Sequence, residues 1–144
     1  MKGSNLEEFV GLTVEPGTMM VDTGAQIPLI GMPQLEALGE HLKNKLGVTY
    51  RWTCNKHGYT GGVGGRCELI GTVEIPMGIA GESGIKEMKG TSADIPPLLP
   101  GKFVKDMKAS LDYDSEEITW KGLNGKKSKM IMMPSDHIAC RVDE

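Results

Sequence analysis

Short runs of apolar residues, separated by glycines, prolines and charged residues, make up most of the chain. Runs of this length that are rich in β-branched residues and bounded by turn residues are typical of strands. The pattern predicts a mostly β domain with strands at 7–14, 18–22, 27–30, 48–53, 68–77 and 111–113. A turn signal at Glu15-Pro16-Gly17 predicts that the first two of these strands pair as a hairpin.

Turn residues also organise the second half of the chain. Residues 79–88 are expected to form a strand pair that turns at Gly81-Glu82-Ser83-Gly84. Asn124-Gly125 is a strong hairpin signal. We therefore expect 118–120 and 129–133 to pair across the segment that contains it.

Helical periodicity is limited to one long segment, which begins at Met32-Pro33. Its apolar stripe recurs at spacings of three and four, at Leu35, Leu38, Leu42 and Leu46. Gly47 follows directly and is a plausible C-terminal cap. A short second helix is expected within 101–110, whereas 91–99 is expected to be extended because its prolines exclude a helix.

Composition limits the class of protein. The chain has 144 residues, enough for one domain with a core of its own. Its 16 basic and 19 acidic residues give a net charge of −3, and no basic stripe indicates a nucleic-acid partner. No apolar run approaches the length that spans a membrane. The 20 glycines and 8 prolines agree with a β-rich domain that has many turns.

The N-terminus and the cysteines bear on the compartment. Residues 1–5 contain no apolar core and do not form a signal peptide. Gly3-Ser4 suggests that the N-terminal segment 1–8 includes a cloning remnant. The cysteines are odd in number and suggest no disulfide framework: Cys54, Cys67 and Cys140. A reducing compartment, the cytoplasm, is therefore the expected location.

The stretch with the clearest chemistry is 19–26, where an apolar run ends in Asp-Thr-Gly-Ala. Burying a carboxylate among apolar residues costs free energy unless Asp22 is hydrogen-bonded or shares a proton. The hydroxyl of Thr23 is a hydrogen-bond donor for such an acid, and Gly24 allows a sharp turn with close backbone approach. Taken alone, the triplet is better explained as a simple strand-ending turn, because Asp and Gly are common turn formers.

Three segments together resemble one protein family. Apolar residues followed by Asp22-Thr23-Gly24-Ala25 resemble the catalytic turn of aspartic proteases, in the form used by retroviral and retrotransposon polyproteins. Downstream, Gly61-Gly62-Val63-Gly64-Gly65 resembles the glycine-rich flap tip of these proteases. Residues 93–104 resemble the family's apolar-apolar-Gly segment and the short helix that brace the catalytic turn. Here Pro100 stands where the family most often has glycine or another small residue, and the glycine follows at Gly101.

The resemblance covers about 9–113, which we interpret as a retropepsin-like aspartic protease domain. Residues 114–144 exceed the usual size of a retroviral-type protease and are expected to form a C-terminal β extension of the same domain. Within this extension, 134–139 resembles an additional strand of some retrotransposon-like relatives. The tail is also a candidate for an interchain sheet, which termini form in this family.

The implied fold is the single-lobed acid protease fold, mostly β and closed like a barrel, with one or two short helices. A two-lobed aspartic protease carries two Asp-Thr/Ser-Gly turns in a chain of roughly twice this length. This chain carries one such turn. The resemblance therefore implies a two-fold homodimer in which each chain contributes one Asp22.

The resemblance assigns catalysis to Asp22, Thr23 and Gly24. Two Asp22 carboxylates would share one proton, activate a water and polarise the scissile carbonyl, so that neither a metal nor a cofactor is needed. Thr23 would hydrogen-bond across the dimer interface. The substrate would bind as an extended strand. The residues expected to contact it are Ala25, Ile30, Gly61, Gly62, Val63, Gly64, Gly65 and Leu98.

The function implied is that of an aspartic endopeptidase that processes a polyprotein. The main alternative is a catalytically weak or inactive module with the same fold, which dimerises and binds extended peptides. A zinc site at Cys54, His57 and Cys67 is a weaker alternative, because these three ligands are irregularly spaced and lack a clear fourth. A cysteine protease is weaker still, because nothing in the sequence brings a cysteine to a histidine.

Overall fold

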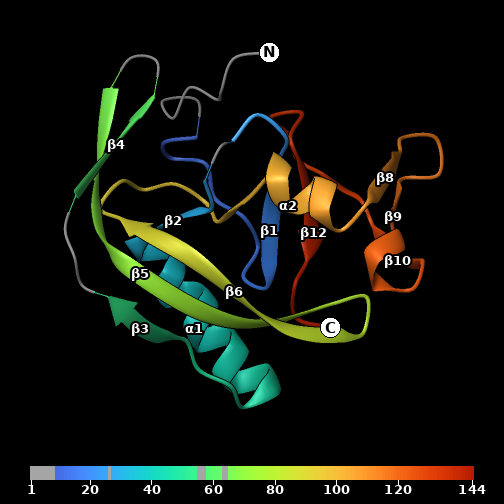
Figure 1. The fold of residues 1–144 in the computed structure, drawn as a ribbon, viewed down its shortest axis with the longest axis horizontal. Helices are drawn as coiled ribbons and strands as arrows, with labels where there is room; N and C mark the ends of the chain where they lie inside the picture. The colour runs from blue at the N-terminus through green and yellow to red at the C-terminus, as the bar shows by residue number, and fades with distance from the viewer. Residues whose placement is uncertain (1–8, 26, 55–57, 63–64) are drawn as a thin grey trace.

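The computed structural model of the chain describes residues 9–25, 27–54, 58–62 and 65–144. In these residues the chain forms twelve strands in three sheets, together with two α-helices (Figure 1). The prediction of a mostly β domain is confirmed. The sheets described do not close into a barrel, but their arrangement is compatible with the expected single-lobed acid protease fold.

The first sheet has β1 as a central strand. Its order is β11 (Ile131–Met132), β12 (Ile138–Arg141), β1 (Thr18–Asp22) and β7 (Leu98–Pro100). β1 runs antiparallel to β12 and parallel to β7. The side chains of Met19 and Met20 point to opposite faces of the sheet, and both have no exposed surface. β1 therefore reads as an unbroken apolar run because both faces of the strand are covered.

The second sheet carries a long hairpin. Its order is β2 (Leu29–Gly31), β6 (Glu82–Thr91), β5 (Gly65–Ile79) and β3 (Arg51–Cys54), and β4 (Gly58–Gly62) pairs with the first part of β5. β5 and β6 turn at Ala80 and Gly81, where φ is 52° and 85°. Positive φ at both residues is what a tight two-residue hairpin turn requires. The turn expected at Gly81–Gly84 is thus shorter, and Glu82 already pairs with Ile79.

The third sheet consists of β8 (Ala109–Asp112), β9 (Glu117–Trp120) and β10 (Lys126–Lys129). The turn at Asn124-Gly125 is confirmed, preceded by the short 3-10 helix η2 (Lys121–Leu123). The partner of β9 is Lys126–Lys129 and not the predicted 129–133. Ile131 and Met132 instead leave this hairpin and pair with β12. The strands of the chain's C-terminal part are thus divided between the first sheet, which contains β11 and β12, and the small peripheral third sheet (Figure 1).

Helix α1 (Met32–Leu46) matches the predicted period. Pro33 lies in its first turn, and Leu35, Leu38 and Leu42 are buried against the sheets. Gly47 ends the helix in the left-handed region at φ 69°, and its amide donates to the carbonyl of Lys43 over 3.0 Å. The second helix, α2 (Gly101–Asp106), is shorter than expected because the chain re-enters a strand at Ala109.

The predicted strand at 7–14 is wrong for the part described, 9–14. Both edges of β1 are occupied, by β12 and by β7, so no edge is left for a hairpin with this segment. The segment is instead anchored by Phe9, which is fully buried in a second apolar cluster with Met20 and Leu98. Gly11 has φ 82°, and its amide donates to the carbonyl of Asp94 over 2.8 Å.

The C-terminal residues are part of the fold. β12 supplies the antiparallel neighbour of β1 from within the same chain. Val142 donates its amide to the carbonyl of Gly17, and its own carbonyl accepts from Gly78, each over 2.8 Å. The tail therefore joins the start of β1 to the end of β5. An interchain sheet formed by this tail stays a prediction.

Candidate active site

Asp22 is the last residue of the central strand β1. In the parallel pairing with β7 it lies opposite Pro100, the last residue of that strand. β1 and β7 therefore end side by side, the first in the Asp-Thr-Gly turn and the second in helix α2 (Figure 1). Because β1 is held on both sides, the position of the Asp22 backbone is fixed by the sheet and not by the loop that follows.

The turn after β1 folds back on the carboxylate. The amide of Gly24 donates to Oδ1 of Asp22 over 3.1 Å, and the amide of Ala25 donates to the Asp22 carbonyl over 3.1 Å. A backbone N–H directed at a carboxylate stabilises the negative charge. Asp22, Gly24 and Ala25 are half-buried, whereas Thr23 is exposed. The turn thus orients the Asp22 carboxylate through its backbone and leaves part of this residue exposed to solvent.

Gly101 braces this turn from the neighbouring strand. A Cβ atom at Gly101 would clash with the carbonyl oxygen of Thr23, so only glycine allows α2 to approach so closely. The amide of Gly101 also donates to the carbonyl of Ala25 over 3.3 Å. Pro100 precedes it in an extended conformation, with φ −75° and ψ 166°. The glycine needed for close packing is therefore present one position later than the family pattern suggests.

The glycine-rich segment forms a hairpin, as expected. β4 pairs antiparallel with β5, with Gly61 opposite Arg66 and Gly62 opposite Gly65. The tip residues Val63 and Gly64 lie outside the described residues. In the view of Figure 1, the tip end of this hairpin lies on the same side of the molecule as the loop after β1. Its contact with a substrate stays a prediction.

The other expected substrate residues differ in exposure. Ala25 is half-buried beside the acid. Ile30 and Leu98 have no exposed surface and pack in the two apolar clusters of the core. In this structure they are therefore core residues. Their role in lining a substrate pocket stays a prediction, and it would require their side chains to become exposed.

The weaker alternatives gain no support from the described residues. His57 lies outside them, and within them no group of three metal-ligating side chains occurs. Cys54 is exposed and Cys140 is buried. Burial, with a smaller contribution from Glu144, raises the pKa of Cys140 to about 12, so this thiol remains protonated and is not a nucleophile at neutral pH.

The architecture is that of a single-lobed acid protease domain, with the Asp-Thr-Gly turn at the end of a central strand and a glycine-rich hairpin at one end of the second sheet. Among solved structures, the chain is similar to the retroviral protease-like domain of Ddi1 from Leishmania major. The TM-score is 0.50 at 18% sequence identity, and the match covers 69% of this chain and 74% of that one. The chain therefore has a retropepsin-like fold.

Comparisons at the sequence level add nothing to this result. No protein-family model matches the chain, and the curated proteins give no match. At 18% identity, the structural likeness establishes the fold alone. Among the described residues, no helix is long and apolar enough to cross a membrane.

Proposed function

We propose that the chain is an aspartic endopeptidase whose active site forms between two copies. The observation that carries this proposal is the geometry of Asp22. The acid ends a central strand, its Oδ1 accepts the amide of Gly24, and its turn is packed against Gly101. A carboxylate held by backbone on a rigid sheet, with part of its surface open, is suited to proton transfer.

The chemistry follows from bringing two Asp22 carboxylates together across a two-fold axis. Two like charges this close do not both ionise, so the pair would hold one proton. The ionised carboxylate would take a proton from a bound water, whose oxygen attacks the scissile carbonyl, while the other Asp22 donates its proton to the carbonyl oxygen. Collapse of the resulting diol to an acid and an amine, with proton return to the nitrogen, would complete hydrolysis.

The second copy is required because each chain supplies one Asp-Thr-Gly turn. Thr23 is exposed at the outer side of this turn and would hydrogen-bond to the partner copy. The expected assembly is therefore a two-fold homodimer. Ala25 and the β4–β5 hairpin would border the substrate, which would bind as an extended chain beneath the hairpin.

A polyprotein is the substrate that the retroviral resemblance favours. Its cleavage sites would lie in extended linkers between domains, because the site must admit a strand-like segment. No cofactor or metal takes part in the proposed reaction.

The direct test is cleavage of a mixed peptide library by the wild-type chain and by Asp22→Asn, at acidic and at near-neutral pH. Cleavage by the wild type alone, blocked by a statine-type inhibitor, is expected. Cleavage by Asp22→Asn would exclude the aspartic protease mechanism. If a sample shown to be dimeric leaves the library intact, the chain is better described as a dimeric peptide-binding module of the same fold.

A mixing experiment tests whether the site is shared between two chains. Asp22→Asn is added in threefold excess to a constant amount of wild type, at a concentration where the chain is dimeric. Random exchange would leave only about a quarter of the wild-type chains paired with each other, and the activity should fall to about a quarter. Unchanged activity after exchange would mean that one chain carries a complete site.

A further inference from the structure

One edge of β6 is open along half of the strand. β6 pairs with β5 along its whole length, but β2 pairs only with Lys89, Gly90 and Thr91. On the side away from β5, no described strand lies beside the segment from Ser83 to Glu87. An unpaired strand edge offers a row of backbone donors and acceptors to another extended chain.

The backbone groups that face this open edge can be assigned from the register. The amide of Lys89 donates to the carbonyl of Pro28, so at Lys89 the backbone faces the β2 side. Backbone groups alternate along a strand, which directs those of Glu87, Ile85 and Ser83 to the same side. Pro76 lies opposite Ile85 and has no N–H to exchange with it, in agreement with this assignment.

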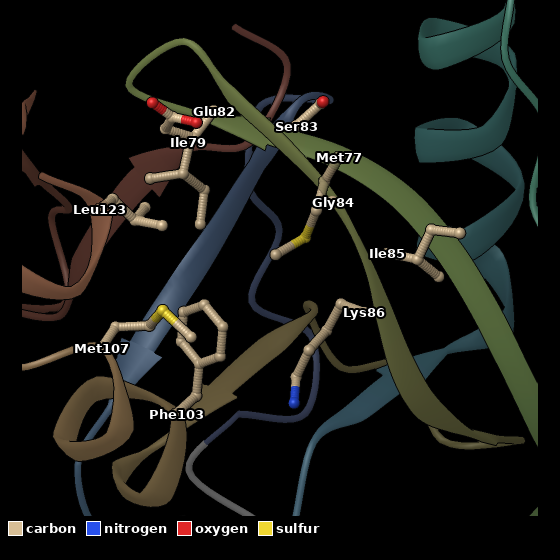
Figure 2. A pocket seen from close by; sticks show the side chains of 10 residues that line it. All are labelled: Met77, Ile79, Glu82, Ser83, Gly84, Ile85, Lys86, Phe103, Met107 and Leu123. Carbon is tan, nitrogen blue, oxygen red and sulfur yellow. The ribbon is translucent and has the colours of Figure 1, made fainter.

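An apolar groove lies between this edge and helix α2. A cavity of about 220 Å³ is lined by Met77 and Ile79 of β5, Phe103 and Met107 of the α2 region, and Leu123 (Figure 2). A second cavity of about 330 Å³ shares Phe103 and Met107 with the first, continues to Pro100, and is also lined by the charged residues Lys86, Lys102 and Asp106. The two together form one groove along the inner face of the open edge.

Gly84 leaves room in this groove. It lines the first cavity, and a Cβ atom placed on it would meet nothing within 4 Å. Gly84 and Lys86 lie on one face of β6, the face directed at α2, whereas the side chain of Ile85 points the other way (Figure 2). Ile85 is 70% exposed and extends the apolar surface onto the outer face.

Lys86 supplies a positive charge that no described carboxylate contacts directly. Its Nζ lies 5.2 Å from the centroid of the Phe103 ring. Other charges at the rim pair with each other: Lys126 with Glu82 over 2.8 Å, and Lys102 with Asp106 over 2.7 Å. In the described part of the chain Lys86 has no carboxylate in ion-pair contact. Burial lowers the pKa of its ammonium, and the more distant charges of Glu87 and Asp106 offset this only in part. A ligand carboxylate would meet a cation already held in place.

We propose that this groove binds an extended peptide, which adds to β6 as a further strand. Side chains of a strand that face one side are two residues apart, as Gly84 and Lys86 are. The bound peptide would therefore place an apolar side chain in the space over Gly84 and, two positions along, an acidic side chain at Lys86. The residue between them would lie on the outer face beside Ile85.

The open backbone edge favours a peptide over a lipid or a compact metabolite, because only an extended chain can use the groups of Ser83, Ile85 and Glu87 in succession. The groove differs from the proposed active site and requires neither Asp22 nor cleavage. It would hold an extended segment of a partner protein that carries an apolar and an acidic side chain two residues apart.

The test uses two capped peptides, Thr-Thr-Leu-Thr-Glu-Thr-Thr and the same sequence with Lys in place of Glu. Each is titrated into the isotope-labelled full chain, and amide chemical shifts and fluorescence anisotropy are recorded. The Glu peptide should bind about tenfold more tightly than the Lys peptide and should shift the amides of Ser83, Ile85 and Glu87. Shifts confined to the turn at Asp22 would place the peptide in the proposed active site instead and overturn the proposal.

Two variants separate the two contacts. Lys86→Met should bind the Glu peptide about tenfold more weakly than the wild type does, and should no longer prefer it to the Lys peptide. Lys129→Met is the control, because it makes the same change at an exposed lysine of β10. It should keep the wild-type affinity and the wild-type preference. Gly84→Val should fill the groove and abolish binding of both peptides with no loss of thermal stability, since its Cβ meets open space and valine suits a strand.

The experiment also distinguishes peptide binding from an alternative role of Lys86, the protection of the open strand edge. An inward-pointing lysine can serve to keep a free strand edge from pairing with other chains. In that case Lys86→Met would raise self-association of the protein, measured by light scattering, and neither peptide would bind the wild type. That result, or peptide affinity unchanged by both Lys86→Met and Gly84→Val, would overturn the proposal.

Discussion

Two aspartates of this chain show how differently a fold can use a carboxylate. Asp143 lies near the C-terminus, is 1% exposed, and accepts hydrogen bonds from the side chains of Arg141, His41 and Lys45. Arg141 contacts it over 2.6 and 2.8 Å, His41 over 2.7 Å and Lys45 over 3.1 Å. Asp22 is half-buried, and its Oδ1 accepts the backbone amide of Gly24.

The difference separates a structural acid from a candidate catalytic one. Burial raises the pKa of Asp143, but the hydrogen bonds from Arg141, His41 and Lys45 outweigh it and hold the pKa well below its usual range. That acid stays ionised and joins α1 to the C-terminal tail. A carboxylate held by a backbone amide on an open turn keeps room for water and for a second carboxylate. Burial with hydrogen bonds from Arg141, His41 and Lys45 therefore indicates a role in stability for Asp143, whereas the half-open position of Asp22 leaves room for the proton transfer that we propose.

The largest expected effect is that of Asp22→Asn on peptide cleavage. Asparagine keeps the acceptor for the amide of Gly24 but can neither take nor give the proton, so the rate should fall by about 100-fold or more. The free energy of unfolding should change by less than about 1 kcal/mol. Peptide hydrolysis and urea unfolding of the same sample measure the two quantities. A large loss of stability would make Asp22 a structural acid, like Asp143.

Asp143→Asn should show the opposite profile. Removing the charge leaves Arg141, Lys45 and His41 facing each other without their common partner. Because these side chains are 27–46% exposed and can reach water, we expect a loss of about 3 kcal/mol, the lower end of the range for broken buried pairs. Urea unfolding measures it. Where the folded fraction is restored by a stabilising additive, the cleavage rate per folded molecule should equal that of the wild type.

Local signals in the sequence were sufficient to predict the elements whose formation depends on residues close together in the chain. The leucine period with its C-terminal glycine predicts α1, because helix formation depends on neighbours three and four residues apart. The apolar run that ends in Asp22 predicts β1 and its turn, and the glycines at 61–65 predict a hairpin. The resemblance of these segments to the retropepsin-like family agrees with the fold.

Pairings between distant segments could not be read from the sequence. Residues 9–14 have strand-like composition, but the edge of β1 that they would need is taken by β12, more than a hundred residues away. Asp143, in Cys-Arg-Val-Asp-Glu at the end of the chain, has no local feature that distinguishes it from an exposed acid. Its role depends on His41 and Lys45, which only the tertiary fold brings to it.

Gly101→Ala tests the support that Gly101 gives to the Asp-Thr-Gly turn. The new Cβ would clash with the carbonyl of Thr23, so either α2 or the turn must move. We expect a loss of about 1–3 kcal/mol in the free energy of unfolding and a fall in the cleavage rate that is larger than the unfolded fraction explains. Gly84→Ala is the matched control, because its Cβ meets open space and should change stability by less than about 0.5 kcal/mol. Equal effects of the two alanines would show that Gly101 gives the turn no particular support.

The smallest expected effect is the pH dependence of the contribution that Asp143 makes to the free energy of unfolding. Its pKa is lower in the folded chain than in the unfolded one, so its contribution to stability is fully present above the unfolded pKa of about 3.9 and is lost as the pH falls through the folded pKa. The stability advantage of wild type over Asp143→Asn should therefore be constant near neutral pH and shrink below about pH 4, by at most about 1.4 kcal/mol per pH unit.

Urea unfolding at a series of pH values checks this difference, with Glu82→Gln as the control. Glu82 also has a lowered pKa, because its side chain accepts a hydrogen bond from Lys126. That pair lies at the surface, where solvent screens it, so Glu82→Gln should leave the pH profile close to that of the wild type. If the advantage of wild type over Asp143→Asn stayed constant down to pH values well below 4, proton binding at Asp143 would not be linked to folding.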